Sequence, residues 1–197
     1  MWLSVLGSVY DVSSGEFYTS GGGYAFFAGR DATRAFTTGE FEGEGLSDDV
    51  DGLTPAQCKG LVEWRAFYEE HETYTRVGVL RGRFYDAQGS PTEALQRVHA
   101  QAAEADREDN ARKERSKRFP ACSSRWTKET GSVLWCEGGK VPRRDRGASK
   151  KGSARCACFE VAYTVAHPEL EVFEGCEPHA EKCNLPKPAD TTRADSD

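Results

Sequence analysis

The residues best suited to chemistry in this chain are the tyrosines that bracket a run of glycines near its start. Tyr18 and Tyr24 flank three consecutive glycines at 21–23, and an apolar run follows before a short helix expected to begin near Asp31. Consecutive glycines let the backbone take positive φ and approach a bulky ligand closely. A flat, hydrophobic cofactor needs such a glycine-rich wall with aromatic sides and a polar atom aimed inward. The alternative interpretation is a glycine-rich surface turn with two ordinary tyrosines.

Further blocks extend the pattern along the chain. They lie at residues 6–15, 18–24, 27–36 (Phe-Ala-Gly-Arg-Asp-Ala-Thr-Arg-Ala-Phe), 45–48, 64–68, 74–78, 82–86, 122–126, 133–136 and 155–159. Together they resemble the membrane-associated progesterone receptor family, whose shared domain is cytochrome b5-like. The resemblance covers nearly the whole chain, in the same order and at similar spacings. It implies an α+β fold: a cytochrome b5-like haem-binding domain, then a long helix and a small cysteine-rich module.

The resemblance also implies how the cofactor is held. Aligned on the Gly-Arg-Asp block at 29–31, the family's axial tyrosine corresponds to Tyr24, and Tyr18 to the tyrosine that hydrogen-bonds it. Tyr74 corresponds to another pocket tyrosine. The candidate haem-binding residues are therefore Tyr18, Tyr24, Tyr74, Gly22, Gly23 and Phe27, with Tyr24 as the protein ligand of the haem iron.

Histidine ligation is not expected. Ordinary cytochrome b5 holds its haem between two histidines, the first in a His-Pro-Gly-Gly turn, and this chain has no such turn. Its histidines, which lie outside the glycine-rich loop, are His71, His99, His167 and His179. A phenolate ligand favours ferric haem b and lowers its reduction potential. Thr73 stands where the family's progesterone receptor component has a lysine, so one donor to the phenolate or the propionates is missing.

Composition limits the partners. The 197-residue chain carries a net charge of −6, with 29% charged residues, so we expect no nucleic acid as partner. A local basic run at 140–155, interleaved with glycine and serine, is interpreted as a solvated loop. No run approaches the ~20 apolar residues that a membrane-spanning helix needs.

The start of the chain bears on its location. Residues 1–6 lack a basic leader, and their apolar run is shorter than the h-region of a signal peptide. Relatives in the family usually carry an anchor or a signal, then an opening strand and helix, before the point where this chain begins. We therefore expect the chain to be N-terminally incomplete. The family resemblance implies a secreted protein or one of the endomembrane lumen.

The cysteines are unevenly placed. Cys58 lies on the apolar stripe of an expected helix and is interpreted as a core thiol. Six cysteines fall after position 120, which predicts a disulfide framework in a short, loop-rich region: Cys122, Cys136, Cys156, Cys158, Cys176 and Cys183. Cys156 and Cys158 are too close to bond each other and should have separate partners. Zinc, with His167 and His179 as extra ligands, is the alternative.

Turn residues, helix-capping residues and prolines predict the secondary-structure elements and domains of the chain. Residues 2–12 form a hairpin with its turn at Gly7-Ser8, and a helix capped by Thr54 begins at Pro55. A strand is expected over 74–84, and a long helix, opened by a second capping box at 90–93, runs to about Arg118. The predicted division is a domain at 1–86, a charged helical spacer at 87–118, a cysteine-rich module at 119–185 and a disordered tail at 186–197.

Three functions agree with these features. The first is a non-enzymatic haem-binding protein. The second is a redox or haem-delivery partner of another haem enzyme, such as a cytochrome P450, with haem-mediated self-association as a related option. The third is a protein-interaction module that binds little haem. No nucleophile–base pair, paired-carboxylate site or phosphate-binding loop is recognisable, so catalysis is not expected.

Overall fold

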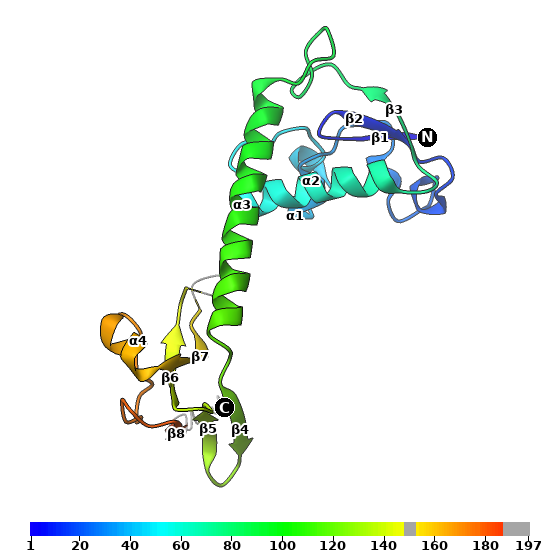
Figure 1. Ribbon diagram of the computed structural model, residues 1–197. Helices are drawn as coiled ribbons and strands as arrows, with labels where there is room; N and C mark the ends of the chain where they lie inside the picture. Colours follow the sequence, from blue (N-terminus) through cyan, green and yellow to red (C-terminus); the bar gives the residue numbers. More distant parts are fainter. Residues whose placement is uncertain (148–152, 187–197) are drawn as a thin grey trace, which may run out of the picture. The chain divides into compact units, whose positions relative to one another are not determined.

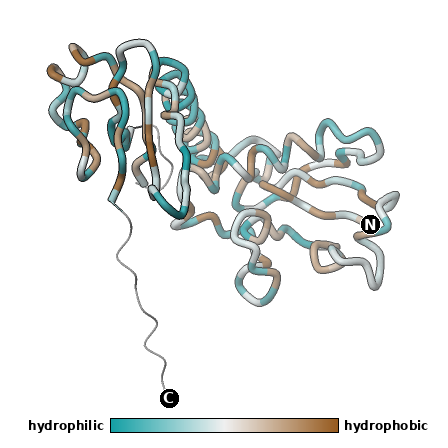
Figure 2. Tube along the Cα trace, turned by 90° about the horizontal axis from the view of Figure 1, so that it is seen from below, coloured by the Kyte–Doolittle hydropathy of each residue, from teal (hydrophilic) through white to brown (hydrophobic). Residues whose placement is uncertain are grey.

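The computed structural model describes residues 1–147 and 153–186, and the chain divides into two compact units, Met1–Glu108 and Asp109–Asp197. In the first unit, β1 (Trp2–Val5), β2 (Ser8–Asp11) and β3 (Thr75–Val79) form an antiparallel sheet in that order (Figure 1). Figure 2 shows hydrophobic residues, in brown, interspersed with hydrophilic ones in the part of the chain that holds the N-terminus. The expected mixture of helices and sheet is confirmed. The predicted domain boundaries stay predictions.

The turn between β1 and β2 is the point at which distant parts of the first unit meet. Val5 pairs with Ser8, so the turn residues are Leu6 and Gly7, both with positive φ, rather than the predicted Gly7-Ser8. The turn lies one residue earlier than predicted because a segment further along the chain accepts hydrogen bonds from the N–H groups of both turn residues. Leu6 donates to Thr33 Oγ1 at 2.7 Å and Gly7 donates to Asp31 Oδ2 at 2.9 Å.

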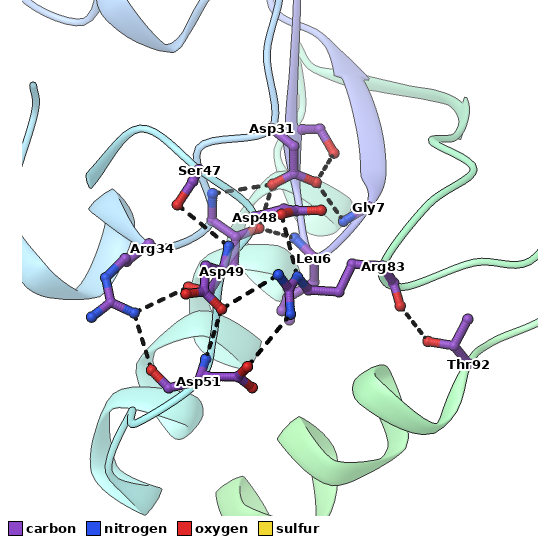
Figure 3. Close-up of polar contacts among 12 residues, drawn as sticks. Leu6, Gly7, Asp31, Arg34, Ser47, Asp48, Asp49, Asp51, Arg83 and Thr92 are labelled. Atoms are coloured by element: carbon purple, nitrogen blue, oxygen red, sulfur yellow. Dashed lines mark hydrogen bonds and ion pairs between the residues drawn. The ribbon is translucent and has the colours of Figure 1, made fainter. Parts of the chain in front are cut away.

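Asp31 is also bound from β1 and from its own segment. Its carboxylate accepts from the hydroxyl of Ser4 (2.8 Å) and from the backbone and side chain of Thr33 (Figure 3). Backbone bonds from Gly29 N–H to Trp2 O and from Ser4 N–H to Arg30 O complete the attachment. Because Asp31 is committed to the turn, the short helix begins later than expected, as α1 (Ala35–Thr38), and ends at Gly39 with φ +74.

An acidic segment follows α1 and is folded around one arginine. After the short 3-10 turn η3 (Gly43–Gly45), Arg83 approaches the carboxylates of Asp48, Asp49 and Asp51 at 3.3, 3.4 and 3.9 Å (Figure 3). The groups are partly exposed, so the attraction is screened by water. The contacts nevertheless connect this segment to the stretch that precedes the long helix.

Two helices enclose the core of the first unit. α2 (Pro55–Glu70) begins with the predicted capping box, in which Thr54 and Gln57 bond reciprocally. α3 (Glu93–Arg118) begins later than the predicted proline start, because Pro91 bridges to Tyr85 and Thr92 N–H donates to Phe84 O. The two helices are linked by Cys58 Sγ, which donates to Gln101 Oε1 at 2.8 Å. Burial raises the pKa of this free thiol, as a core role implies.

β3 is shorter than the predicted strand at 74–84. It ends at Val79, where Leu80 N–H donates to Gly7 O, and the chain then turns so that Gly82 N–H bonds Tyr85 O. Gly82 has φ +157 in this turn, a backbone conformation that residues with a side chain rarely adopt. Within the residues that the structure describes, no helix has both the length and the apolar composition to cross a membrane.

The second unit is built from short strands and three disulfides. β4 (Ser123–Thr127), β5 (Gly131–Trp135) and β8 (Lys182–Asn184) form one sheet, while β6 (Lys140–Asp145) and β7 (Arg155–Glu160) form a hairpin before α4 (Val161–Ala166). The disulfides join Cys122 with Cys156, Cys136 with Cys158, and Cys176 with Cys183. A small core of this kind needs such cross-links. Its buried apolar cluster comprises Phe119, Ala157, Phe159 and Leu170.

The basic run at 140–155 is not the solvated loop that its composition suggested. Residues 140–145 form β6, with Val141, Arg143 and Asp145 buried. The carboxylate of Asp145 is fully buried and contacts the guanidinium groups of Arg115 (2.8 Å) and Arg155 (3.2 Å), so this buried charge is paired. The remainder of the run at 148–152, and the predicted disordered tail from 187 onward, lie outside the described residues.

The hairpin turn supplies the first testable prediction. Asp31→Asn keeps the shape of the side chain but removes its charge and one acceptor, so a donor at the turn loses its partner. We expect the free energy of unfolding to fall by about 1–3 kcal/mol in urea titrations. Asp86→Asn, in a loop outside this network, is the control. A stability equal to that of the parent would show that the turn does not depend on this carboxylate.

Candidate haem-binding site

An aromatic cavity of about 410 Å³ opens beside the glycine-rich loop. Its lining comes from that loop, from α1 with the residues after it, and from α2. The lining residues are Tyr18, Tyr24, Phe27, Ala35, Phe36, Thr37, Thr38, Gly39, Phe41, Trp64 and Tyr68. They offer phenols, two threonine hydroxyls and apolar side chains, with no imidazole, thiol or carboxylate. Both the volume and the aromatic walls suit a flat, hydrophobic ligand.

The glycine-rich loop has a defined conformation around Tyr24. Two short 3-10 turns, η1 (Glu16–Tyr18) and η2 (Ala25–Phe27), flank it, and Tyr24 N–H donates to Phe17 O at 2.9 Å. A Cβ at Gly22 would lie 2.3 Å from that same carbonyl oxygen, so only glycine fits there. Gly22 therefore allows the loop to close, and this closure sets the position of Tyr24.

The phenols of the site differ in burial. Tyr24 is 48% exposed at the cavity, whereas Tyr18 and Tyr68 are buried. The hydroxyl groups of Tyr18 and Tyr68 share a hydrogen bond of 2.8 Å. Burial raises the pKa of both Tyr18 and Tyr68, so both stay neutral at physiological pH. Of these three phenols, Tyr24 is the one that is exposed at the cavity.

Tyr68 is a site residue that the sequence analysis placed only on the apolar stripe of a helix. It lies on α2, and its ring stacks on Tyr10 at a centroid distance of 5.4 Å. The hydroxyl of Tyr10 takes no part in the bond between Tyr18 and Tyr68 and donates to the carboxylate of Glu69, at 2.8 Å. A helical stripe of large side chains does not reveal that one of them, Tyr68, lines a cavity and that its hydroxyl bonds another tyrosine. The signal available in the sequence was a tyrosine, rather than phenylalanine, at a position expected to be buried.

The structure brings some of the predicted residues to the cavity and leaves others outside its lining. Tyr18, Tyr24 and Phe27 line it, whereas Gly22, Gly23 and Tyr74 do not. Tyr74 nevertheless contacts the site, since its ring lies edge-on to that of Tyr18 at 5.9 Å. The Tyr18 hydroxyl, expected to bond Tyr24, bonds Tyr68 instead, and the rings of Tyr18 and Tyr24 lie 6.0 Å apart.

His71 lies near this cluster, but its ring nitrogen Nδ1 is already bonded. Its ring stacks on Tyr74 at 3.9 Å, and Nδ1 accepts from Thr73 N–H at 3.2 Å. The hydroxyl of Thr73 also bonds this nitrogen, at 3.1 Å. Thr73, the residue that replaces the family's lysine, is thus engaged with His71.

Another cavity, of about 350 Å³, lies on the sheet. Its lining comprises Trp2, Leu3, Ser4, Val9, Gly29, Arg30, Asp31, Val77, Gly78, Val79 and Leu80. None of these side chains is a phenol, an imidazole or a thiol. A metal-containing cofactor would find no soft or aromatic oxygen ligand there, and we therefore place the candidate site at the tyrosine cavity.

The bond between Tyr18 and Tyr68 gives a second prediction. Tyr18→Phe or Tyr68→Phe alone should destabilise the ligand-free protein, because each leaves a buried hydroxyl without its partner. Changing both should cost less than the sum, with a coupling of about 1 kcal/mol in a double-mutant cycle followed by urea unfolding. Tyr10→Phe, which removes a neighbouring hydroxyl bonded elsewhere, is the control for Tyr68→Phe. Additive losses from the two changes would contradict the shared hydrogen bond.

Comparisons with known proteins identify the family. The model of the cytochrome b5-like haem/steroid-binding domain matches residues 1–81. Membrane-associated progesterone-binding protein 4 of Arabidopsis thaliana is 43% identical, over 93% of this chain and 76% of its own length. The neuferricins of Danio rerio and Homo sapiens are 37% and 36% identical, over 95% and 94% of this chain and 73% and 79% of theirs.

A solved Arabidopsis protein, described as a putative steroid-binding protein, is 35% identical over 41% of this chain and 78% of its own, with a TM-score of 0.36. The family rests on the sequence relatives, which match throughout both compact units. The chain therefore belongs to the neuferricins of the membrane-associated progesterone receptor family, with a cytochrome b5-like haem-binding domain at its N-terminal end.

Proposed function

We propose that this protein is a non-enzymatic binder of ferric haem b and that Tyr24 is the protein ligand of the iron. The observation that carries the proposal is the half-exposed Tyr24 phenol at an aromatic cavity whose other phenols are buried and hydrogen-bonded. When bound, haem supplies a ferric ion that takes an anionic oxygen ligand, which favours Fe(III) over Fe(II). The residues present fit this group.

The side chains around Tyr24 have distinct tasks. Phe27 and Phe36, stacked at 4.2 Å, together with Trp64, supply apolar walls that exclude water. When Tyr68 donates its proton to Tyr18, the proton of Tyr18 is free to point into the pocket. A hydrogen bond from that proton to the Tyr24 oxygen would stabilise the ionised ligand. Tyr68 thereby acts on Tyr24 through Tyr18.

The lack of acid–base groups at the cavity supports a non-enzymatic role. General acid–base catalysis needs a group whose pKa lies near the working pH. Among the described residues, the lining offers phenols and threonine hydroxyls, and burial moves the pKa of Tyr18 and Tyr68 further upward. These groups are suited to binding and orienting a cofactor.

Location and partners follow from the surface and the disulfides. Three disulfides support a secreted or endomembrane-lumen location, because such bonds persist in oxidising compartments. Large aromatic side chains stay exposed around the cavity: Phe17, Phe41, Trp64 and Phe67. This apolar rim supports association with a second copy through haem, or with a haem enzyme such as a cytochrome P450, to which haem or electrons would be delivered.

Tyr24→Phe tests the ligand. The parent protein, mixed with ferric haem, should bind one equivalent and show a high-spin spectrum with a phenolate charge-transfer band. The variant should lose that band while its circular dichroism stays that of the parent, because phenylalanine fills the same space without the oxygen. If Tyr24→Phe binds haem as tightly as the parent and with the same spectrum, the ligand is another residue.

Tyr18→Phe is the matched comparison. It removes the hydroxyl that we propose donates to the ligated Tyr24 oxygen, and leaves the ligand itself in place, so haem should still bind, more weakly, by about 1–3 kcal/mol. A parent protein that binds no haem would instead favour the interaction-module function.

The redox behaviour is a separate prediction. Phenolate ligation keeps iron ferric, so a cytochrome b5 reductase with NADH should reduce the haem-loaded protein slowly or not at all. Stopped-flow absorbance measures this rate against ordinary cytochrome b5. Rapid reduction to a low-spin ferrous form would show a b5-like electron carrier, and would require a histidine such as His71 to leave its bonds with Thr73.

A further inference from the structure

Four of the six bonded cysteines are gathered at one place in the second unit. Ser123 pairs with Trp135, which brings Cys122, just before β4, opposite Cys136, just after β5. Cys156 and Cys158 lie two residues apart on β7, so their side chains share one face of the strand. Three separate segments thus contribute to one cluster of sulfur atoms, here called the four-cysteine cluster.

The spacing of these sulfur atoms suits a metal ion. Cys122 Sγ and Cys136 Sγ belong to different disulfides yet lie 3.9 Å apart. The sulfurs of Cys122, Cys136 and Cys158 all lie within 4.8 Å of one another. Tetrahedral zinc, with Zn–S bonds of about 2.3 Å, places its thiolates about 3.8 Å apart. The fourth sulfur, that of Cys156, is bonded directly to Cys122.

The backbone would keep this arrangement without the disulfides. Cys122 N–H donates to Cys156 O at 3.2 Å, Cys158 N–H to Pro120 O at 2.9 Å, and Cys136 N–H to Glu181 O at 2.9 Å. β6 and β7 remain paired through their own ladder, in which Arg144 faces Cys156. Breaking the S–S bonds therefore frees four ligands on a framework that other bonds maintain.

We propose that reduction of the Cys122–Cys156 and Cys136–Cys158 disulfides converts the four-cysteine cluster into a structural Zn²⁺ site. A dithiol is the reductant. Each disulfide takes two electrons and two protons from one dithiol molecule, which becomes a cyclic disulfide. The four thiols formed then release four protons as they bind Zn²⁺ as thiolates. The cluster thus stabilises the second unit in both redox states, by covalent bonds when oxidised and by metal when reduced.

The metal itself tests the proposal. The full chain is reduced with dithiothreitol, separated from it without oxygen, and titrated with Co²⁺. We expect the intense visible bands of tetrahedral cobalt thiolate, saturating at one Co²⁺ per chain and lost when Zn²⁺ is added. The unreduced protein should show none. Cys176→Ser with Cys183→Ser, which removes the disulfide outside the cluster, should keep the bands, and Cys136→Ser with Cys158→Ser should abolish them.

Three results would overturn the proposal. The first is a reduced protein that shows only the weak spectrum of octahedral cobalt. The second is peptide mapping after reduction that finds a new Cys122–Cys136 disulfide in place of bound metal. The third is loss of the bands in the Cys176→Ser, Cys183→Ser control.

Folding is monitored separately. The strands of the second unit are followed by NMR in every variant. If the cluster double variant does not fold, Cys158→Ser alone decides the matter. It leaves three thiolates and should bind Co²⁺ more weakly, with a shifted spectrum, and an unchanged titration would contradict the site.

Discussion

The carboxylate of Asp31 joins three parts of the first unit through hydrogen bonds. It accepts bonds from the β1–β2 turn, from Ser4 on β1 and from Thr33 in its own segment. This attachment fixes the far end of the glycine-rich loop, because Gly29 and Arg30 are bonded to β1 next to it. The loop that carries Tyr24 is therefore fixed at its C-terminal end, and α1, which also contributes residues to the cavity lining, starts directly after the same segment.

Burial then divides the tyrosines into two kinds. Two buried phenols bonded to each other form a neutral, rigid part of the wall, whereas an exposed phenol at the cavity stays available to a metal. The second unit relies on a different device. Its buried apolar cluster is small, and the disulfides together with the ion pairs of the buried Asp145 with Arg115 and Arg155 connect its segments. The first unit is thus stabilised mainly by an apolar core rich in aromatic residues, and the second unit mainly by disulfides.

Local signals in the sequence predicted the features that depend on neighbouring residues. The Thr54 capping box, the hairpin and the crowding of cysteines belong to this group. Features that depend on distant partners were missed. The hairpin turn lies one residue earlier than predicted because Asp31 and Thr33 accept hydrogen bonds from it. Helix α3 begins after the predicted proline because Pro91 forms a β-bridge with Tyr85. Part of the basic run forms strand β6 because it pairs with β7, a partner further along the chain.

The most direct test of the account is a resonance Raman spectrum of the haem-loaded protein, made with ring-deuterated tyrosine. We expect phenolate vibrations of an iron-bound tyrosine that shift on deuteration and are missing from Tyr24→Phe. A spectrum with no deuterium-sensitive phenolate bands, and with the marker bands of low-spin, histidine-ligated haem, would contradict tyrosine ligation and with it the central role of Tyr24.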